Sequence, residues 1–222
     1  DSHRRQRQMC IRDSRRLELD NARTFLERLG KRRWYAFTRM QTRVCQKIQR
    51  IITVSESSKE DISHDHKVDI NKIHVVPIGI DTDFFAPQTD IERIPGRIVS
   101  TASADVPLKG QKFLLEAIAK VRDEFPHVHL ELVGKQREGS TTAETLNQLG
   151  LDDIVRFNQG ISYKELVNLL ASAEVAIVPS LYEGFSIPAI EALSCGAPLI
   201  ASTGGALPCL LYTSDAADDG YR

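Results

Sequence analysis

The 222-residue sequence has no apolar run of about 18 residues, the length that a membrane-spanning helix needs. Its polar, Arg-rich start also lacks the apolar core of a signal peptide. The cysteines show neither CxxC nor Cys/His ligand spacing; they are Cys10, Cys45, Cys195 and Cys209. We therefore expect a reduced, cytoplasmic protein without structural zinc. A hydrophobic content of 41% and a charged content of 27% are ordinary for a globular chain.

Charge is unevenly distributed, although the net charge is only −1. Residues 1–50 hold 15 Lys/Arg against 5 Asp/Glu, and the remainder holds 14 against 25. A basic arm can meet nucleic acid or an anionic membrane surface, or it can form the solvent face of a long helix. The arm has no interleaved aromatic residues or recognition-helix pattern. We therefore expect no nucleic-acid partner and keep peripheral membrane association, at the inner face, as an alternative.

Strands and helices are expected to alternate between residues 97 and 202. The β-branched and alternating segments predict strands at 97–101, 127–134, 154–157, 175–178 and 199–202. Amphipathic segments predict helices at 111–121, 141–150 and 163–171. This order is typical of an α/β fold, a Rossmann-like parallel sheet with helices on both faces. Ligands of such sheets bind beyond the carboxyl ends of the strands.

The first part of the chain is expected to be helical from 15 to 50, with Gly30 as a candidate break between two helices. A strand from Arg50 to Val54 follows. Ser55 or Ser57 then caps a helix that starts with acidic residues, which suit the helix dipole.

The most informative stretch is residues 179–198, PSLYEGFSIPAIEALSCGAP. It predicts a loop with Glu183 and Gly184, followed by a helix that Ser186 caps and that ends near Gly196. Glu191 lies one turn into this helix, whose first-turn N–H groups form an anion site. The pattern suits a ligand with a phosphate at one end and several hydroxyls at the other. The alternative is a solvated Glu183 and a surface Glu191.

These residues resemble the signature of retaining glycosyltransferases of family 4, which have the GT-B fold of two Rossmann-like domains. That family carries two glutamates separated by seven residues, and the first is followed by Gly-Phe and a small residue. Glu183 and Glu191 match the pair, with Gly184, Phe185 and Ser186 after the first. The segments 50–62 and 73–87 are similar to the end of the family's first domain and to its interdomain turn.

The resemblance implies that the chain is a fragment. Residues 15–90 would be the remnant of an N-terminal acceptor domain with its linker, and 91–208 an incomplete nucleotide-sugar-binding domain. Residues 1–14 contain MCIRDS and residues 209–222 begin CLLYTSDAADDG, and both pieces resemble translated sequencing-adapter sequence. We expect these ends to be non-native or disordered and to carry no function.

The resemblance also implies residue roles. Lys109 and Glu183 would be catalytic, Lys109 by stabilising the departing diphosphate and Glu183 by holding the sugar. Glu191 would bind the ribose hydroxyls. Ala104 stands where the family has an arginine, which puts rate or donor geometry in doubt. The remaining expected donor-binding residues are Gly134 below the nucleotide, Gly160 and Ile161 at the nucleobase, Gly184, Phe185 and Ser186 at the sugar and phosphates, and Thr203 and Gly204 beside the phosphates.

The activity that follows is transfer of a sugar from a nucleotide-diphosphate sugar to a lipid-linked or saccharide acceptor, with retained configuration. The resemblance implies that no metal or other cofactor is needed. Two alternatives remain: an epimerase or phosphorylase of the same fold, and a nucleotide-binding remnant without activity. The sequence identifies neither the sugar, the nucleobase nor the acceptor.

Overall fold

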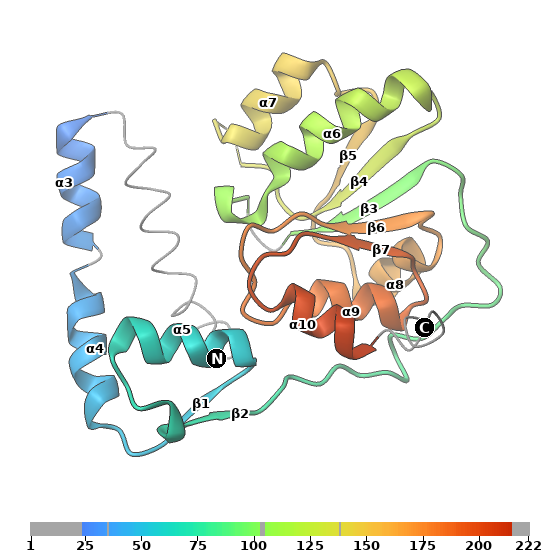
Figure 1. Ribbon diagram of the computed structural model, residues 1–222. Coiled ribbons are helices and arrows are strands. Elements are labelled where there is room, and N and C mark those ends of the chain that lie inside the picture. The colour runs from blue at the N-terminus through green and yellow to red at the C-terminus, as the bar shows by residue number, and fades with distance from the viewer. Residues whose placement is uncertain (1–23, 35, 103–104, 138, 215–222) are drawn as a thin grey trace. The chain divides into compact units, whose positions relative to one another are not determined.

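The computed structural model describes residues 24–34, 36–102, 105–137 and 139–214 (Figure 1). These residues form two compact units. The first unit holds the described residues up to Ile78, together with Tyr182–Phe185 and the residues from Thr203 onward. The second unit holds Gly79–Leu181 and Ser186–Ser202. In the part of the chain that is described, no helix is both long enough and apolar enough to cross a membrane.

A parallel sheet of five strands forms the centre of the second unit, in the order β5-β4-β3-β6-β7. Its strands are β3 (Arg97–Thr101), β4 (His129–Val133), β5 (Val155–Asn158), β6 (Val175–Val178) and β7 (Leu199–Ala201). The chain runs outward from β3 through β4 to β5 and then returns to the other side of β3 with β6. The strand order therefore reverses between β3 and β6, the position at which open α/β sheets bind ligands.

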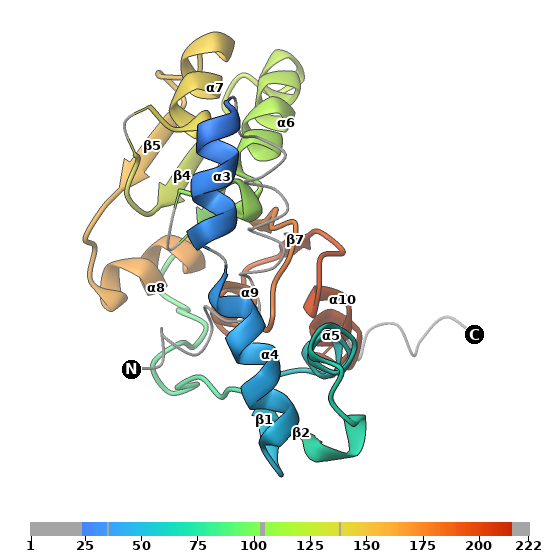
Figure 2. The same ribbon diagram turned by 90° about the vertical axis from the view of Figure 1, so that its left-hand side faces the viewer.

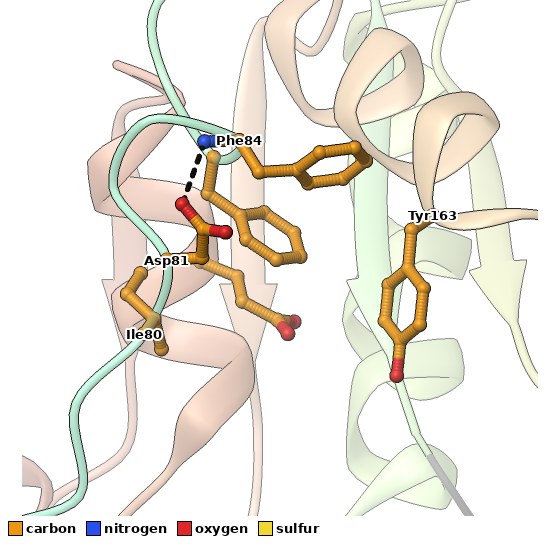
Figure 3. Close-up of a pocket in the computed structure, with 6 residues that line it drawn as sticks. Ile80, Asp81, Phe84 and Tyr163 are labelled. Carbon is orange, nitrogen blue, oxygen red and sulfur yellow. Dashed lines mark hydrogen bonds between the residues drawn. The ribbon is translucent and has the colours of Figure 1, made fainter.

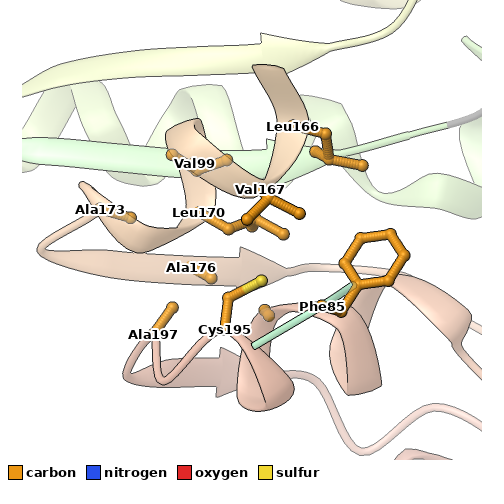
Figure 4. Close-up of a cluster of buried hydrophobic side chains, with 10 residues drawn as sticks. Phe85, Val99, Leu166, Val167, Leu170, Ala173, Ala176, Cys195 and Ala197 are labelled. Carbon is orange, nitrogen blue, oxygen red and sulfur yellow. The ribbon is translucent and has the colours of Figure 1, made fainter. Parts of the chain in front are cut away.

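Helices cover both faces of this sheet, as expected (Figure 1). On one face, α6 (Gln111–Glu124) and α7 (Thr141–Leu149) pack on a cluster that includes Ile98. On the other face, α8 (Tyr163–Ala171) and α9 (Ile187–Ser194) pack on a cluster that includes Val99 (Figure 4). Ile98 and Val99 belong to clusters on opposite faces because successive side chains of a strand point to opposite faces. The prediction of a parallel α/β sheet covered on both faces is confirmed.

The first unit contains a two-stranded parallel sheet of β1 (Ile51–Thr53) and β2 (Ile73–Val75) (Figure 1, Figure 2). Ser55 caps α5 (Glu56–His66) by accepting a hydrogen bond from the N–H of Ser58, which confirms the predicted cap. The short 3-10 turn η1 (Ile70–Lys72) leads into β2. The remaining helices of this unit are α3 (Phe25–Trp34), α4 (Phe37–Lys47) and α10 (Leu207–Ser214).

The predicted break at Gly30 is wrong, because α3 continues through Gly30 and the next helix begins at Phe37. A single glycine inside a helix costs only about 1 kcal/mol relative to alanine, so it weakens a helix without ending it. At the other end of the chain, α10 runs through Cys209, where the sequence changes character, as far as Ser214.

The loops at the carboxyl edge of β3 and β6 are tied together. The loop after β3 ends in the 3-10 turn η2 (Pro107–Lys109), and the N–H of Leu181 donates to the carbonyl of Leu108 at 2.9 Å. Gly110 closes this turn in the left-handed conformation, with φ +68°. A Cβ atom on Gly110 would lie 1.9 Å from the carbonyl oxygen of Pro179. Only glycine therefore lets the two loops approach this closely.

Gly110→Ala should destabilise the chain far more than Gly150→Ala. Both glycines have positive φ, but a Cβ on Gly150 would meet nothing within 4 Å. Gly150→Ala should thus cost only the left-handed strain of about 1–2 kcal/mol, whereas Gly110→Ala adds the clash with Pro179 and should cost more than about 3 kcal/mol. Urea unfolding of the two variants measures the difference, and equal losses would show that the contact with Pro179 is unimportant.

Candidate functional site

Helix α9 begins at Ile187 with Pro188 in its first turn, and Gly196 follows its end at φ +77°. These boundaries confirm the sequence prediction. The prediction that the Ser186 side chain caps the helix is wrong. Ser186 is left-handed, with φ 47° and ψ 76°, and makes no capping hydrogen bond. A capping side chain needs an extended backbone at this position to reach the N–H groups of the first turn.

Ser186 leaves two polar features at the start of α9. Its hydroxyl is buried, at 2% exposure, and has no hydrogen-bond partner among the described residues. The N–H groups of the first turn also lack a side-chain cap. Uncapped N–H groups at the positive end of a helix are suited to a phosphate. A left-handed residue with a side chain costs about 1–2 kcal/mol, so this strain is held in place by the surrounding structure.

A pocket of about 350 Å³ lies in the second unit beside α9 (Figure 3). Tyr163, the first residue of α8, faces Phe84 across it, with ring centroids 6.4 Å apart. Both helices start after strands of the parallel sheet, so the pocket belongs to the carboxyl edge of that sheet. Its lining residues are Ile80, Asp81, Phe84, Phe85, Tyr163 and Glu191.

Asp81 shapes one wall of this pocket. Its Oδ1 accepts a hydrogen bond from the N–H of Phe84 at 3.0 Å (Figure 3). It also accepts one from the N–H of Asp83 at 3.1 Å, and the two bonds close the turn that presents Phe84. Asp81 and Asp83 have Asp-x-Asp spacing, and the carboxylate of Asp81 is used by the turn. Among the described residues, no group of three or more His, Cys, Asp or Glu side chains could hold a metal ion.

Glu191 is the acidic residue of the pocket, and its side chain is buried at 8% exposure. Burial removes water from the carboxylate and raises the pKa of Glu191 above its ordinary value. Cys195 lies one turn further along α9, and burial, together with the charge of Glu191, raises the pKa of its thiol to about 11. Cys195 is therefore a neutral core residue and not a nucleophile.

Lys109 lies at the end of η2, in the loop after β3, and is half-buried. The same loop is anchored through Asp105, whose carboxylate accepts hydrogen bonds from the Thr142 hydroxyl at 2.5 Å and the Arg137 N–H at 3.1 Å. This contact brings the loop after β4 beside the loop of Lys109. Ala104, which replaces the expected arginine, lies outside the described residues, and Arg137 is an arginine at the same edge.

The glycines predicted after β4 and β5 lie where expected. Gly134 directly follows β4, and a Cβ there would lie 2.3 Å from the carbonyl oxygen of Ala102. Gly160 follows β5 at φ +69° and is exposed. Ile161 packs against the cluster under α8 and α9. These positions agree with the predicted nucleotide site, but their binding roles stay predictions.

The remaining predicted residues belong to the first unit: Glu183, Gly184, Phe185, Thr203 and Gly204. Glu183 is buried at 7% exposure, and its carbonyl accepts the N–H of Ala206 at 2.8 Å. The alternative of a solvated Glu183 and a surface Glu191 is therefore wrong, because both side chains are buried. Convergence of the two carboxylates on one ligand stays a prediction.

Several residues that were not predicted from the sequence lie beside the predicted ones. Phe84 and Tyr163 line the pocket of Glu191, and Ser55 and Ser58 contact the carbonyl of Gly184. An aromatic pair after the Asp81 turn and an aromatic residue at the first position of a helix are weak signals alone. They become informative only when the fold brings them to the same edge.

Two family comparisons agree with this geometry. The model of the family described as "Glycosyl transferases group 1" matches residues 91–211, and that of "Glycosyltransferase Family 4" matches residues 16–84. The second unit, with its parallel α/β sheet, is thus a glycosyltransferase-type domain. The chain belongs to the group 1 glycosyltransferase family.

Two curated relatives have names that describe sugar transfer. The "MMP alpha-(1->4)-mannosyltransferase" of Mycolicibacterium hassiacum is 50% identical over 177 residues, covering 80% of this chain and 42% of the relative. The "D-inositol 3-phosphate glycosyltransferase" of Mycolicibacterium smegmatis is 32% identical over 195 residues, covering 82% and 44%. The chain therefore spans less than half the length of these relatives.

Solved structures share the GT-B glycosyltransferase architecture. Sucrose-phosphate synthase from Thermosynechococcus elongatus superposes with a TM-score of 0.66 at 26% identity, covering 78% of this chain and 45% of that one. Anabaena HepE, solved in complex with UDP-glucose, has a TM-score of 0.66 at 19% identity, covering 80% and 52%. The second likeness shows the fold alone.

Glu191→Gln should stabilise the chain at neutral pH and remove part of its pH dependence. The folded protein raises the pKa of Glu191 above the ordinary 4.5, so its favourable contribution is complete below that value. The contribution is lost as the pH rises through the raised pKa. The amide of the variant cannot ionise, and we therefore expect a higher Tm for the variant than for the native chain at pH 7.

Thermal denaturation between pH 4 and pH 8 measures this effect, with Glu124→Gln on the exposed end of α6 as the matched control. The gain should shrink towards pH 4, because the raised pKa favours the neutral form of Glu191 in the folded native chain as the pH falls. A gain that stays constant over this range would contradict the role of ionisation.

Proposed function

We propose that this chain is the donor-binding part of an enzyme that transfers a sugar from a nucleotide-diphosphate sugar, with retention of configuration, to a saccharide or lipid-linked acceptor. One observation carries the proposal: a buried carboxylate, Glu191, lines an aromatic pocket beside an uncapped helix start. A nucleoside diphosphate needs a carboxylate that accepts hydrogen bonds from its hydroxyl groups and a helix end that binds its phosphates.

The nucleoside is assigned to the pocket of Glu191. An ionised carboxylate only accepts hydrogen bonds, so it suits the two hydroxyls of a ribose. Binding these hydroxyls replaces the water that burial removes from Glu191, which offsets the cost that raises its pKa. Tyr163 and Phe84 offer ring surfaces for the apolar parts of the nucleoside. Gly160 and Ile161, in the loop that leads to Tyr163, are assigned to the nucleobase.

The diphosphate is assigned to the start of α9 and to the loop after β3. The first-turn N–H groups and the Ser186 hydroxyl supply hydrogen bonds, and Lys109 supplies a positive charge. Arg137 is the candidate to replace the missing arginine, because its backbone is bonded to Asp105 in the Lys109 loop. Fixed donors of this kind stabilise the negative charge that develops on the leaving diphosphate. We propose that this charge stabilisation operates without a metal ion.

Glu183, with Gly184 and Phe185, is assigned to the sugar, and Thr203 and Gly204 to the phosphates. The relatives favour transfer over the alternatives of epimerisation or phosphorolysis, since both are named for sugar transfer. The acceptor site is assigned to the rest of the longer protein that such relatives form, at the cytoplasmic face of the membrane where the acceptor is lipid-linked. A nucleotide-binding remnant without turnover is the second candidate, because the chain spans under half of those relatives.

Glu191→Ala should weaken binding of UDP or GDP by about 1–3 kcal/mol, the cost of losing a charged hydrogen bond. Isothermal calorimetry on the chain measures the change, with Glu124→Ala as an exposed control that should bind as the native chain does. Unchanged affinity in Glu191→Ala would refute the ribose assignment. Assays of donor hydrolysis then separate the two candidates, because binding without turnover favours the remnant.

A further inference from the structure

One side of helix α5 holds the loop that carries Glu183. The hydroxyl oxygens of Ser55 and Ser58 lie 2.7 and 3.1 Å from the carbonyl oxygen of Gly184, and 2.7 Å from each other. Tyr182, on the other side of Glu183, donates its hydroxyl hydrogen to Oδ2 of Asp61 at 2.5 Å. Residues three apart lie on the same side of a helix. Both neighbours of Glu183 are thus bonded to one stripe of α5.

The backbone of Glu183 itself is fixed from another direction. Its carbonyl accepts the N–H of Ala206, and a Cβ on Gly205 would lie 2.2 Å from the same oxygen. The close approach leaves no room for the loop to shift towards Gly205. Hydrogen bonds on one side and this contact on the other determine the backbone position of Glu183. All of these residues belong to the first unit.

Ser55 and Ser58 make different sets of hydrogen bonds. Ser55 also caps α5 by accepting the N–H of Ser58, so its loss would damage the helix as well as the loop contact. Each hydroxyl has one proton, so when Ser55 donates to Gly184, Ser58 can donate to Gly184 or to Ser55. Ser58 is fully buried, at 0% exposure. Loss of the Ser58 hydroxyl therefore removes a loop contact and leaves the capping hydrogen bond from the Ser58 N–H to Ser55 in place.

We propose that Ser58 and Asp61 are positioning residues that set the place of Glu183 for the sugar of the donor. The inference rests on the proposed function, in which Glu183 binds the sugar and Glu191 binds the ribose. Ser58 and Asp61 fall within residues 16–84, matched by one family model, and Glu183 within residues 91–211, matched by the other. The segment assigned to the acceptor side therefore contributes to the geometry of donor binding.

The test compares two pairs of ligands, and in each pair only one ligand carries the sugar. The full chain is titrated by calorimetry with UDP and UDP-glucose, and with GDP and GDP-mannose. Tyr182→Phe and Asp61→Ala should each weaken binding of the sugar nucleotide by about 3- to 10-fold, the effect of one hydrogen bond. Binding of the nucleoside diphosphate should not change. Ser58→Ala should do the same. Asp61→Asn keeps an acceptor oxygen and should restore the affinity.

The control is Glu60→Ala, an exposed neighbour on α5 that should change neither affinity. The double variant Asp61→Ala with Tyr182→Phe should lose no more than one single variant, because both remove the same bond. Equal weakening of diphosphate and sugar nucleotide, or additive losses in the double variant, would overturn the inference alone. A native chain that binds neither ligand would overturn the proposed function and the inference together.

Discussion

Parallel pairing of β3 with both β4 and β6 is the constraint on which the rest of the second unit depends. Because all five strands run the same way, every loop that follows a strand emerges at one edge. The strand order reverses at β3, so the loops after β3 and β6 follow neighbouring strands. The Gly110–Pro179 contact holds these two loops together. Of the groups assigned to the diphosphate, Lys109 lies in the loop after β3, and Ser186 and the start of α9 follow β6.

The site is formed by groups that reduce stability. Glu191 is a carboxylate held away from water, and Ser186 combines a left-handed backbone with a buried hydroxyl that has no partner among the described residues. Each is unfavourable for folding, and the proposed ligand would supply hydrogen bonds to both groups. Both features are consistent with the proposed ligand, a nucleoside diphosphate with a sugar.

The sequence predicted the elements of the second unit well, because hydrophobic periodicity and turn residues such as Gly196 are local signals. It predicted the burial of neither glutamate, which depends on packing between distant segments. The Ser186 prediction failed because the residue type favours capping, whereas the backbone that the loop imposes forbids it. Contacts such as Ser58 with Gly184 join residues 126 positions apart, and no local pattern reveals them.

The most direct test of the account is hydrogen exchange on the chain with and without saturating UDP or GDP. The account predicts slower exchange in the first turn of α9, in the loop of residues 105–110 and around residues 160–163. The last turn of α6, which ends at Glu124 far along the helix from the Gly110 turn, serves as the internal reference and should not change. Protection confined to residues away from the carboxyl edge of the sheet would contradict the assignment of this edge as the donor site.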